Sequence, residues 1–468
     1  MRKRIIYIAA LLFLLPLPLS RAQTRLGLTL EQCKELSEKN DTDLKNAALD
    51  ISSAKALRQE AVSEFFPKLS LNALGFYAID EPLLKIGLKD VLGNSDGAQN
   101  LIDQIESAAP LYGINTVASF LDYGYNASAL LTQPIYAGGR IVNGNRLAKL
   151  NLQASRLKAA SVARDKKVEV EEKYWAVVSL EEKLLTVNQA LNTMDTLFRD
   201  VRNACLAGFA LDTDTLKVSL ERKRLQADRT KLLSGIRLSK MDLFNAIGQK
   251  YSYFASAANE SAPWIDDIAL LDRPAQMQAP ENYYVDGELA ALRSEESHLL
   301  ALNVESARLQ KKMAIGEALP QLGVGVGYGY GRFVGDRGRW NGSVFAMVKI
   351  PLTDYVKASA KAKRMENDAQ KAENQQEYLN GQLVLQMHKL WEDLNCSYEK
   401  IGIAADEVAL GELAESRMLA RYLSGQATIA ELLTARTDLR LAQDKLTEAR
   451  IEYAKTLSSY LSKSRTGN

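Results

Sequence analysis

Few residues in this sequence combine the type and the spacing that chemistry requires. The two histidines, His298 and His388, lie in helical patterns, and neither has cysteines or further histidines at metal-ligand spacing. The run GVGVGYGYG, residues 323–331, contains glycines spaced as in a nucleotide-binding loop, but they alternate along a strand and no helix follows. The sequence therefore predicts no enzyme, no metal site and no cofactor.

Two carboxylates occupy equivalent positions in the two halves of the sequence. Asp214 and Glu431 are 217 residues apart, and each comes six residues after a glycine, Gly208 or Gly425. A negative charge at the start of a helix is stabilised by the helix dipole by about 0.3 to 1 kcal/mol, so the pair could simply favour two helix starts. Any further role depends on the elements that hold them.

The matching positions belong to an internal repeat. Adding 217 to each number places the same landmarks in the second half without a gap: Pro134 on Pro351, Leu206 on Leu423, Gly208 on Gly425 and Gln226 on Gln443. A repeat of this length predicts two copies of one structural unit. We assign residues 23–248 to the first repeat, 249–285 to a linker that contains three prolines, and 286–468 to the second repeat.

Each repeat contains a helix far longer than average. In the first copy apolar residues recur every three or four positions, as in a coiled-coil seam: Val177, Leu180, Leu184, Val187, Leu191, Met194, Phe198, Val201 and Cys205. The second copy keeps this register with breaks at Ser397, Gly411 and Glu415. Helices are predicted over about 140–206 and 355–422, and a second helix follows each turn, over about 214–247 and 429–461. At about 1.5 Å per residue the helix over 140–206 is roughly 100 Å long. An ordinary coiled coil is the simplest alternative interpretation of this pattern.

Strands are predicted before each long helix, over about 68–79 and 126–136 in the first repeat and 321–333 and 342–352 in the second. In the second repeat apolar residues alternate with glycines and other residues, which is typical of a strand. In a membrane the apolar side would face lipid, which predicts these lipid-facing residues: Leu322, Val324, Val326, Tyr328, Val344 and Val348. A soluble β-sandwich is the alternative.

Four strands cannot close a barrel by themselves. A membrane leaves no backbone group unpaired, so a membrane location requires several chains. Three copies give 12 strands, whereas two give 8 and leave little lumen. Loops are expected between the paired strands, over about 80–123 in the first repeat and 334–341 in the second.

The N-terminus and the composition limit the location and the partners. Residues 1–22 have the basic start, apolar run and small residues of a cleaved export signal, and no later segment approaches the roughly 18 apolar residues of a transmembrane helix. The net charge of +2, without basic clusters interleaved with aromatics, argues against nucleic-acid binding. The three cysteines have no paired spacing, so no disulfide framework is predicted.

From about Leu30 to Leu461 the chain resembles the TolC family of outer-membrane efflux channels. The resemblance is carried by the duplication, by EFFPKLSL and EALPQLGV, by QPIYAGG and KIPL, and by the tips LAGFALDTDTL and YLSGQATIAELLTAR. It implies a mainly α-helical fold with a small β part, in which a homotrimer forms a 12-stranded outer-membrane β-barrel continued by an α-helical periplasmic tunnel. It also implies a passive duct of a tripartite efflux or type I secretion system, opened by a periplasmic adaptor and an inner-membrane pump.

The resemblance also implies roles for the matching positions. The turns would form the periplasmic end and dock the adaptor through Leu206, Gly208, Phe209, Leu423, Gly425 and Gln426. Asp214 and Glu431 would lie near the periplasmic entrance, where the carboxylates of three chains raise one another's pKa and favour cations. Thr434 stands where some members place a further acid, which weakens such a ring. A periplasmic coiled-coil adaptor or scaffold is the alternative function, but it would carry one hairpin rather than two.

Overall fold

The computed structural model describes residues 26–79, 84–93, 95–109, 117–120, 123–257, 261–274, 277–332, 338–351 and 355–465. The predicted export signal lies outside these residues. The chain divides into two compact units, each built from separate stretches of sequence. The first unit contains Met1–Ile51, Ser155–Leu299 and Gln376–Asn468, and the second contains Ser52–Ala154 and Leu300–Gln375.

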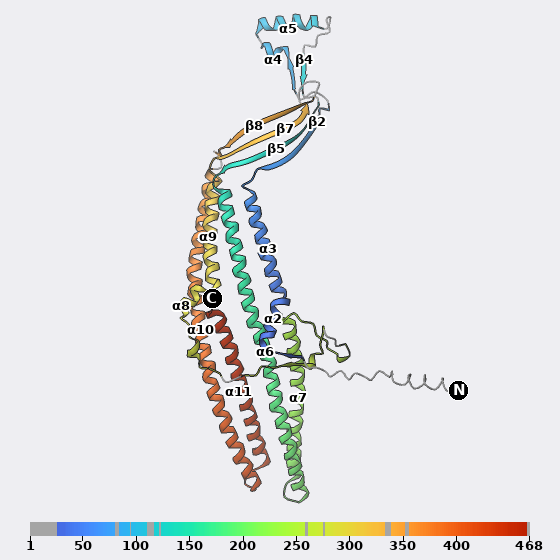
Figure 1. Cartoon of the computed structure of the whole chain (residues 1–468), viewed down its shortest axis with the longest axis vertical. Coiled ribbons are helices and arrows are strands. Elements are labelled where there is room, and N and C mark those ends of the chain that lie inside the picture. Colours follow the sequence, from blue (N-terminus) through green and yellow to red (C-terminus); the bar gives the residue numbers. More distant parts are fainter. Residues whose placement is uncertain are drawn as a thin grey trace, which may run out of the picture. The chain divides into compact units, whose positions relative to one another are not determined.

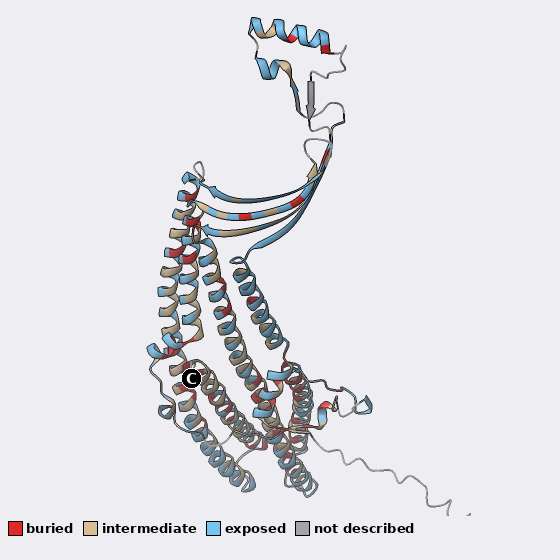
Figure 2. Ribbon diagram, turned by 45° about the horizontal axis from the view of Figure 1, so that its top comes forward, coloured by how far each residue is buried: buried red, intermediate tan, exposed pale blue. Residues whose placement is uncertain are grey.

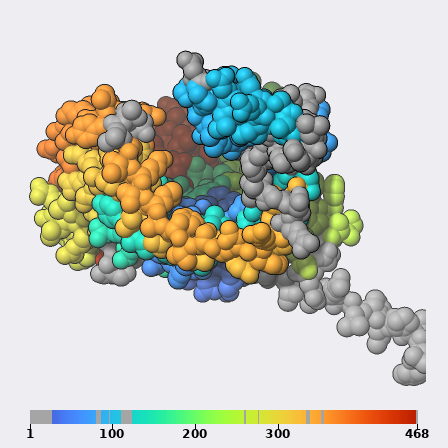
Figure 3. All heavy atoms as spheres, turned by 90° about the horizontal axis from the view of Figure 1, so that it is seen from above, coloured from blue at the N-terminus to red at the C-terminus, as the bar shows by residue number. Residues whose placement is uncertain are grey.

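The second unit contains one four-stranded antiparallel sheet, in the order β2-β5-β7-β8. Its strands are β2 (Lys68–Tyr77), β5 (Tyr123–Ala137), β7 (Gln321–Arg332) and β8 (Arg339–Lys349). These bounds differ from the predicted ones by at most three residues. The central pairing, β5 with β7, joins the two repeats, and Figure 3 shows teal residues of the first repeat against orange residues of the second.

Two helical hairpins follow the strands in the chain. Helix α6 (Arg140–Leu206) is followed by α7 (Asp212–Ala246), and α10 (Tyr355–Leu423) by α11 (Ile429–Ser464). All four run without interruption (Figure 1), because none contains a proline in its interior and apolar residues recur at helical spacing along their whole length. The prediction of a mainly α-helical fold with a small β part is confirmed.

The heptad seam of the long helices is the packed side of each hairpin. All nine seam residues of α6 are buried or half-buried, and so are all nine matching positions of α10. The three breaks in the second copy are explained by contacts with α11: the Ser397 hydroxyl lies 2.8 Å from the Thr456 hydroxyl, a Cβ on Gly411 would lie 3.3 Å from the Leu439 Cα, and Glu415 forms an ion pair with Arg436 at 2.9 Å. Polar pairing and close backbone approach thus replace apolar packing at these levels.

The remaining elements differ from the expected pattern in two places. The expected loop 80–123 contains β3 (Leu84–Gly87), α4 (Leu88–Leu92), α5 (Asp96–Ala108) and β4 (Val117–Phe120), and β3 pairs with β4. The linker 249–285 contributes β6 (Ile268–Leu270), which pairs in parallel with β1 (Leu26–Leu28). These strands are short and their partners are distant in sequence, so local alternation gave no signal for them.

The first helix of each repeat is interrupted. In the first repeat α2 (Leu30–Asn40) ends at Asp41, and α3 (Thr42–Ser63) begins there because the Asp41 carboxylate accepts the N–H groups of Asp43 and Leu44 at 2.7 and 3.1 Å. In the second repeat α8 (Gly287–Arg293) is followed by α9 (Glu295–Gly316). Each pair leads the chain to the first strand of its repeat.

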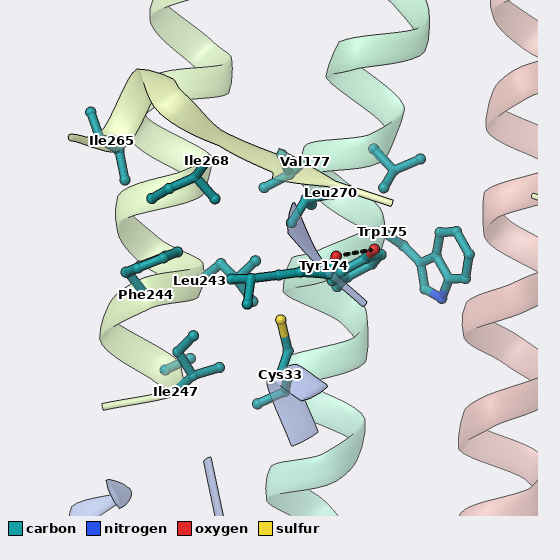
Figure 4. Packing of buried hydrophobic residues seen from close by; sticks show 14 of the residues in the cluster. Cys33, Tyr174, Trp175, Val177, Leu243, Phe244, Ile247, Ile265, Ile268 and Leu270 are labelled. Carbon is teal, nitrogen blue, oxygen red and sulfur yellow. Dashed lines mark hydrogen bonds between the residues drawn. The ribbon is translucent and has the colours of Figure 1, made fainter. Parts of the chain in front are cut away.

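The largest core of the first unit lies where α6, α7, β1 and β6 meet (Figure 4). Tyr174 is fully buried there, and its hydroxyl lies 3.1 Å from both the Leu28 carbonyl oxygen and a carboxylate oxygen of Asp272. Burial raises the pKa of the neighbouring Cys33 thiol to about 12, so this cysteine stays protonated. The core therefore ties the start of the chain and the linker to the hairpin α6–α7.

Candidate functional sites on the sheet and the hairpin tips

One side of the sheet, here called the apolar face, is continuous across all four strands. Directly opposed residues of antiparallel strands share a face, and Leu69 pairs with Leu131, Leu131 with Val326, and Val326 with Val344. The six residues predicted to face lipid all lie on this face, and their exposed fractions range from 37% for Leu322 to 82% for Val344. Most of the sheet is exposed in the single chain (Figure 2).

Aromatic side chains gather at one end of the apolar face, where β2 and β7 end and β5 and β8 begin. This aromatic belt consists of Tyr77, Tyr123, Tyr125, Tyr328, Tyr330 and Trp340. Tyr328 stacks on Trp340 with ring centroids 5.4 Å apart, and the Arg332 guanidinium lies 3.4 Å from the centroid of the Tyr123 ring. Tyrosine and tryptophan in such a band are typical of a membrane–water interface.

The other side of the sheet, here called the polar face, carries glycines, small polar residues and few apolar ones. Phe345 lies over Gly325, where an added Cβ would come closer than 3.0 Å to the ring. The face consists of Lys68, Ser70, Asn72, Leu74 and Phe76 of β2; Gly124, Asn126, Ser128, Leu130 and Thr132 of β5; the odd-numbered residues 321–331 of β7; and Arg339, Asn341, Ser343, Phe345, Met347 and Lys349 of β8.

Both edges of the sheet are open within the described chain. Strand β2 pairs only with β5, and β8 pairs only with β7. The two edge strands run in opposite directions, because each of the three pairings is antiparallel. A second copy could therefore add its β2 to β8 in the same antiparallel pattern.

The turn between α6 and α7 ends the long helix with a glycine C-cap. The Phe209 N–H donates to the Ala204 carbonyl at 2.8 Å and the Gly208 N–H to the Cys205 carbonyl at 3.0 Å, the two bonds of a Schellman motif. Gly208 has φ +77°, which an L side chain rarely adopts. Leu206 and Phe209 are 79% and 89% exposed, so the tip presents apolar side chains to solvent.

The turn between α10 and α11 repeats this geometry. The Gln426 N–H donates to the Arg421 carbonyl at 2.8 Å, the Gly425 N–H to the Tyr422 carbonyl at 3.0 Å, and Gly425 has φ +74°. Leu423 is 76% exposed. All six residues predicted to form the tips therefore lie in two equivalent turns, and each glycine ends a long helix.

The two predicted acids have different surroundings. Glu431 belongs to a capping box: its carboxylate accepts the Thr428 N–H at 2.7 Å and the Thr428 hydroxyl at 2.9 Å, and these bonds lower the pKa of Glu431. Asp214 is half-buried and accepts from Lys217 at 3.4 Å, and its charge adds to burial in raising the pKa of Tyr422 on the other hairpin. Glu431 thus stabilises a helix start, whereas Asp214 lies beside the neighbouring hairpin.

The tips are held together by one shared core. Val201, Val218 and Leu225 of the first hairpin pack with Ile429 and Leu432 of the second, and all five are buried. Within the described residues no helix is long and apolar enough to cross a membrane. In the same residues no cluster of three or more histidine, cysteine, aspartate or glutamate side chains could hold a metal ion.

Solved structures of outer-membrane channels share this architecture. VceC of Vibrio cholerae matches with a TM-score of 0.71 at 15% identity, over 92% of this chain and 95% of its own. CmeC of Campylobacter jejuni matches with a TM-score of 0.71 at 13% identity, over 94% and 86%. MtrE of Neisseria gonorrhoeae, crystallised in an open state, matches with a TM-score of 0.67 at 14% identity, over 94% and 89%.

No family model and no curated protein matches the sequence. Sequence identity to these channels is 13–15%, whereas the structural match covers 92–94% of this chain. The chain has the TolC-family fold, the fold of these outer-membrane channels.

Proposed function

We propose that this protein is an outer-membrane channel of a tripartite efflux or type I secretion system. It acts as a passive trimeric export duct that is opened by a periplasmic adaptor and an inner-membrane pump. The observation that carries the proposal is the sheet: one apolar face with an aromatic belt, one polar face, and two open edges of opposite direction. Such a sheet suits the wall of a barrel that several chains close.

The open edges give the reason for a trimer. An exposed edge strand carries unpaired N–H and C=O groups, and in lipid each unpaired group costs several kcal/mol. Adding β2 of one copy to β8 of the next satisfies both edges, and three copies give a 12-stranded barrel with room for a lumen. Leu322, Val324, Val326, Tyr328, Val344 and Val348 then face lipid, and the polar face lines the duct.

We expect the detergent-extracted protein to have the mass of three chains. Native mass spectrometry or light scattering with correction for detergent measures this directly. The same preparation should stay with the membrane pellet at high salt and high pH, whereas an adaptor or scaffold without an anchor would be released. A stable monomer that carries the folded sheet would contradict the proposal.

The tips supply the partner surface in this proposal. They expose Leu206, Phe209 and Leu423 to solvent beside the two turns that contain Gly208 and Gly425. Exposed apolar side chains grouped at one place are typical of a protein interaction site. We assign this surface to the helical hairpins of the adaptor, on the periplasmic side of the membrane.

Asp214 and Glu431 are proposed to set the ion preference of the periplasmic entrance. The double variant Asp214→Asn, Glu431→Gln is expected to lower the preference for cations and the block by multivalent cations added on the periplasmic side, because six carboxylates per trimer are lost. Single-channel recordings in planar bilayers measure both. Thr428→Ala is the matched control: it removes the capping partner of Glu431 but keeps the carboxylate, so ion preference should stay as in the wild type.

The hydrogen bonds of Glu431 also predict that the stability of the folded chain depends on pH. Its pKa is lowered in the folded chain, first by the Thr428 N–H and then by the Thr428 hydroxyl. A lowered carboxyl pKa contributes stability above the unfolded value, about 4.5, and this contribution is lost as the pH falls through the folded value.

If the ion preference and the cation block were unchanged in the double variant Asp214→Asn, Glu431→Gln, the two carboxylates would have only a structural role at the helix starts.

A further inference from the structure

We infer that the polar face makes the barrel wall prefer anions, through Arg339 and Lys349. The inference rests on the proposed function, because only a closed barrel turns this face into the lining of a duct. It concerns the wall itself, a part of the duct separate from the acids at the tips, and it assigns the anionic parts of transported molecules as the groups that the wall favours.

The first observation is the composition of the strands. The four strands of the sheet contain Lys68, Arg332, Arg339 and Lys349 and no aspartate or glutamate. Their uncharged polar residues are serine, threonine, asparagine, glutamine and tyrosine, which carry no formal charge near neutral pH. Every formal charge on the described wall is therefore positive.

The register decides on which face each charge lies. Arg339 pairs with Gly331 and Gly331 with Asn126, so Arg339 lies on the polar face. Lys349 pairs with Gln321 on the same face. Arg332 instead pairs with Tyr125 on the apolar face, where its guanidinium covers the Tyr123 ring.

The cations of the polar face also differ in whether a carboxylate neutralises their charge. Lys68 is compensated by Glu64 at 2.6 Å, so it adds little net charge. Arg339 and Lys349 are both exposed, and among the described residues neither has a carboxylate within ion-pair distance. The nearest acids in the sequence, Asp336 and Asp354, lie outside the described residues.

The two cations act at different depths. They are ten residues apart on β8, which is about 33 Å along a strand. This is more than three times the Debye length of about 10 Å at 0.1 M salt, so the two act independently. In a trimer each becomes a ring of three charges, and rings of arginine or lysine favour anions in pores.

The test measures the reversal potential of single channels in planar bilayers under a KCl gradient. All variants carry Asp214→Asn and Glu431→Gln as a common background, so that the carboxylates at the tips do not contribute. Adding Arg339→Gln and Lys349→Gln together is expected to lower the chloride-to-potassium permeability ratio by at least about twofold, and each single change by a smaller factor. Raising the salt to about 1 M, where the Debye length is about 3 Å, should weaken the difference.

Two controls make the result specific. Arg332→Gln removes a charge of the same sign from the opposite face and should leave the ratio unchanged. Arg339→Lys with Lys349→Arg keeps both charges and should also leave it unchanged. A permeability ratio in the double glutamine variant equal to that of the background would overturn the inference while leaving the channel intact. Wild-type protein that forms no channel in the same bilayers would instead overturn the proposed function itself.

Discussion

Gly138→Ala is expected to lower the free energy of unfolding by about 2–5 kcal/mol. Gly138 follows β5 and has φ +62°, and an added Cβ would lie closer than 3.0 Å to the carbonyl oxygen of Gly316, at the end of α9. The left-handed conformation alone costs an L residue about 1–2 kcal/mol. The overlap is with backbone, which no side-chain rotation relieves, so forced displacement adds about 1–3 kcal/mol.

The neighbouring glycine provides the control for backbone strain. Gly139 has φ +75°, but the nearest atom to an added Cβ is the Asn143 amide nitrogen at 3.6 Å. Gly139→Ala should therefore cost only the conformational term. Urea unfolding of detergent-extracted protein, with surface abundance by immunoblot, measures both variants; equal losses for Gly138→Ala and Gly139→Ala would show that the contact with Gly316 does not matter.

A second control should change stability in the opposite direction. Gly381 lies in the interior of α10, and nothing lies within 4 Å of an added Cβ. Gly381→Ala is expected to raise the free energy of unfolding by about 0.5–1 kcal/mol, because alanine loses less conformational freedom than glycine in a helix. The three variants together separate backbone overlap, left-handed strain and helix propensity.

Gly208→Leu and Gly425→Leu are expected to abolish export while leaving trimers in the outer membrane. Both glycines have positive φ and no atom within 4 Å of an added Cβ. Leucine there costs about 1–2 kcal/mol of conformational strain, which a folded protein of ordinary stability tolerates. The side chain would project from the tip into the space that the adaptor must occupy. A tenfold loss of docking corresponds to about 1.4 kcal/mol, and accumulation of a dye substrate in cells with the cognate pump reports it.

The control for the tip variants is the same change away from the tip. Gly402 lies in α10 with nothing within 4 Å of an added Cβ, so Gly402→Leu adds equal bulk to the helix surface and should leave export unchanged. Loss of the trimer in Gly208→Leu or Gly425→Leu would mean that these glycines serve only to end the helices. Retained trimers with normal export would remove the tips from the docking surface.

Much of the molecule was predictable because its signals are local. The long helices follow from apolar residues at a spacing of three and four and from the absence of interior prolines, and the four sheet strands follow from alternation. The duplication pairs Gly208 with Gly425 and Asp214 with Glu431, and the two turns have matching hydrogen bonds. The position of Glu431 at the start of a helix likewise follows from one of the two roles that the sequence allows, whereas its capping hydrogen bonds are seen only in the structure.

The remainder was decided by partners that are distant in sequence. The pairing of β5 with β7 brings residues about 200 positions apart into register and so joins the two repeats in one sheet. The same holds for Gly138 beside Gly316, for Glu415 beside Arg436 within a seam that otherwise reads as broken, and for the β1–β6 pair. Periodicity reports which face of an element is apolar, whereas the identity of the neighbour depends on how the whole chain packs.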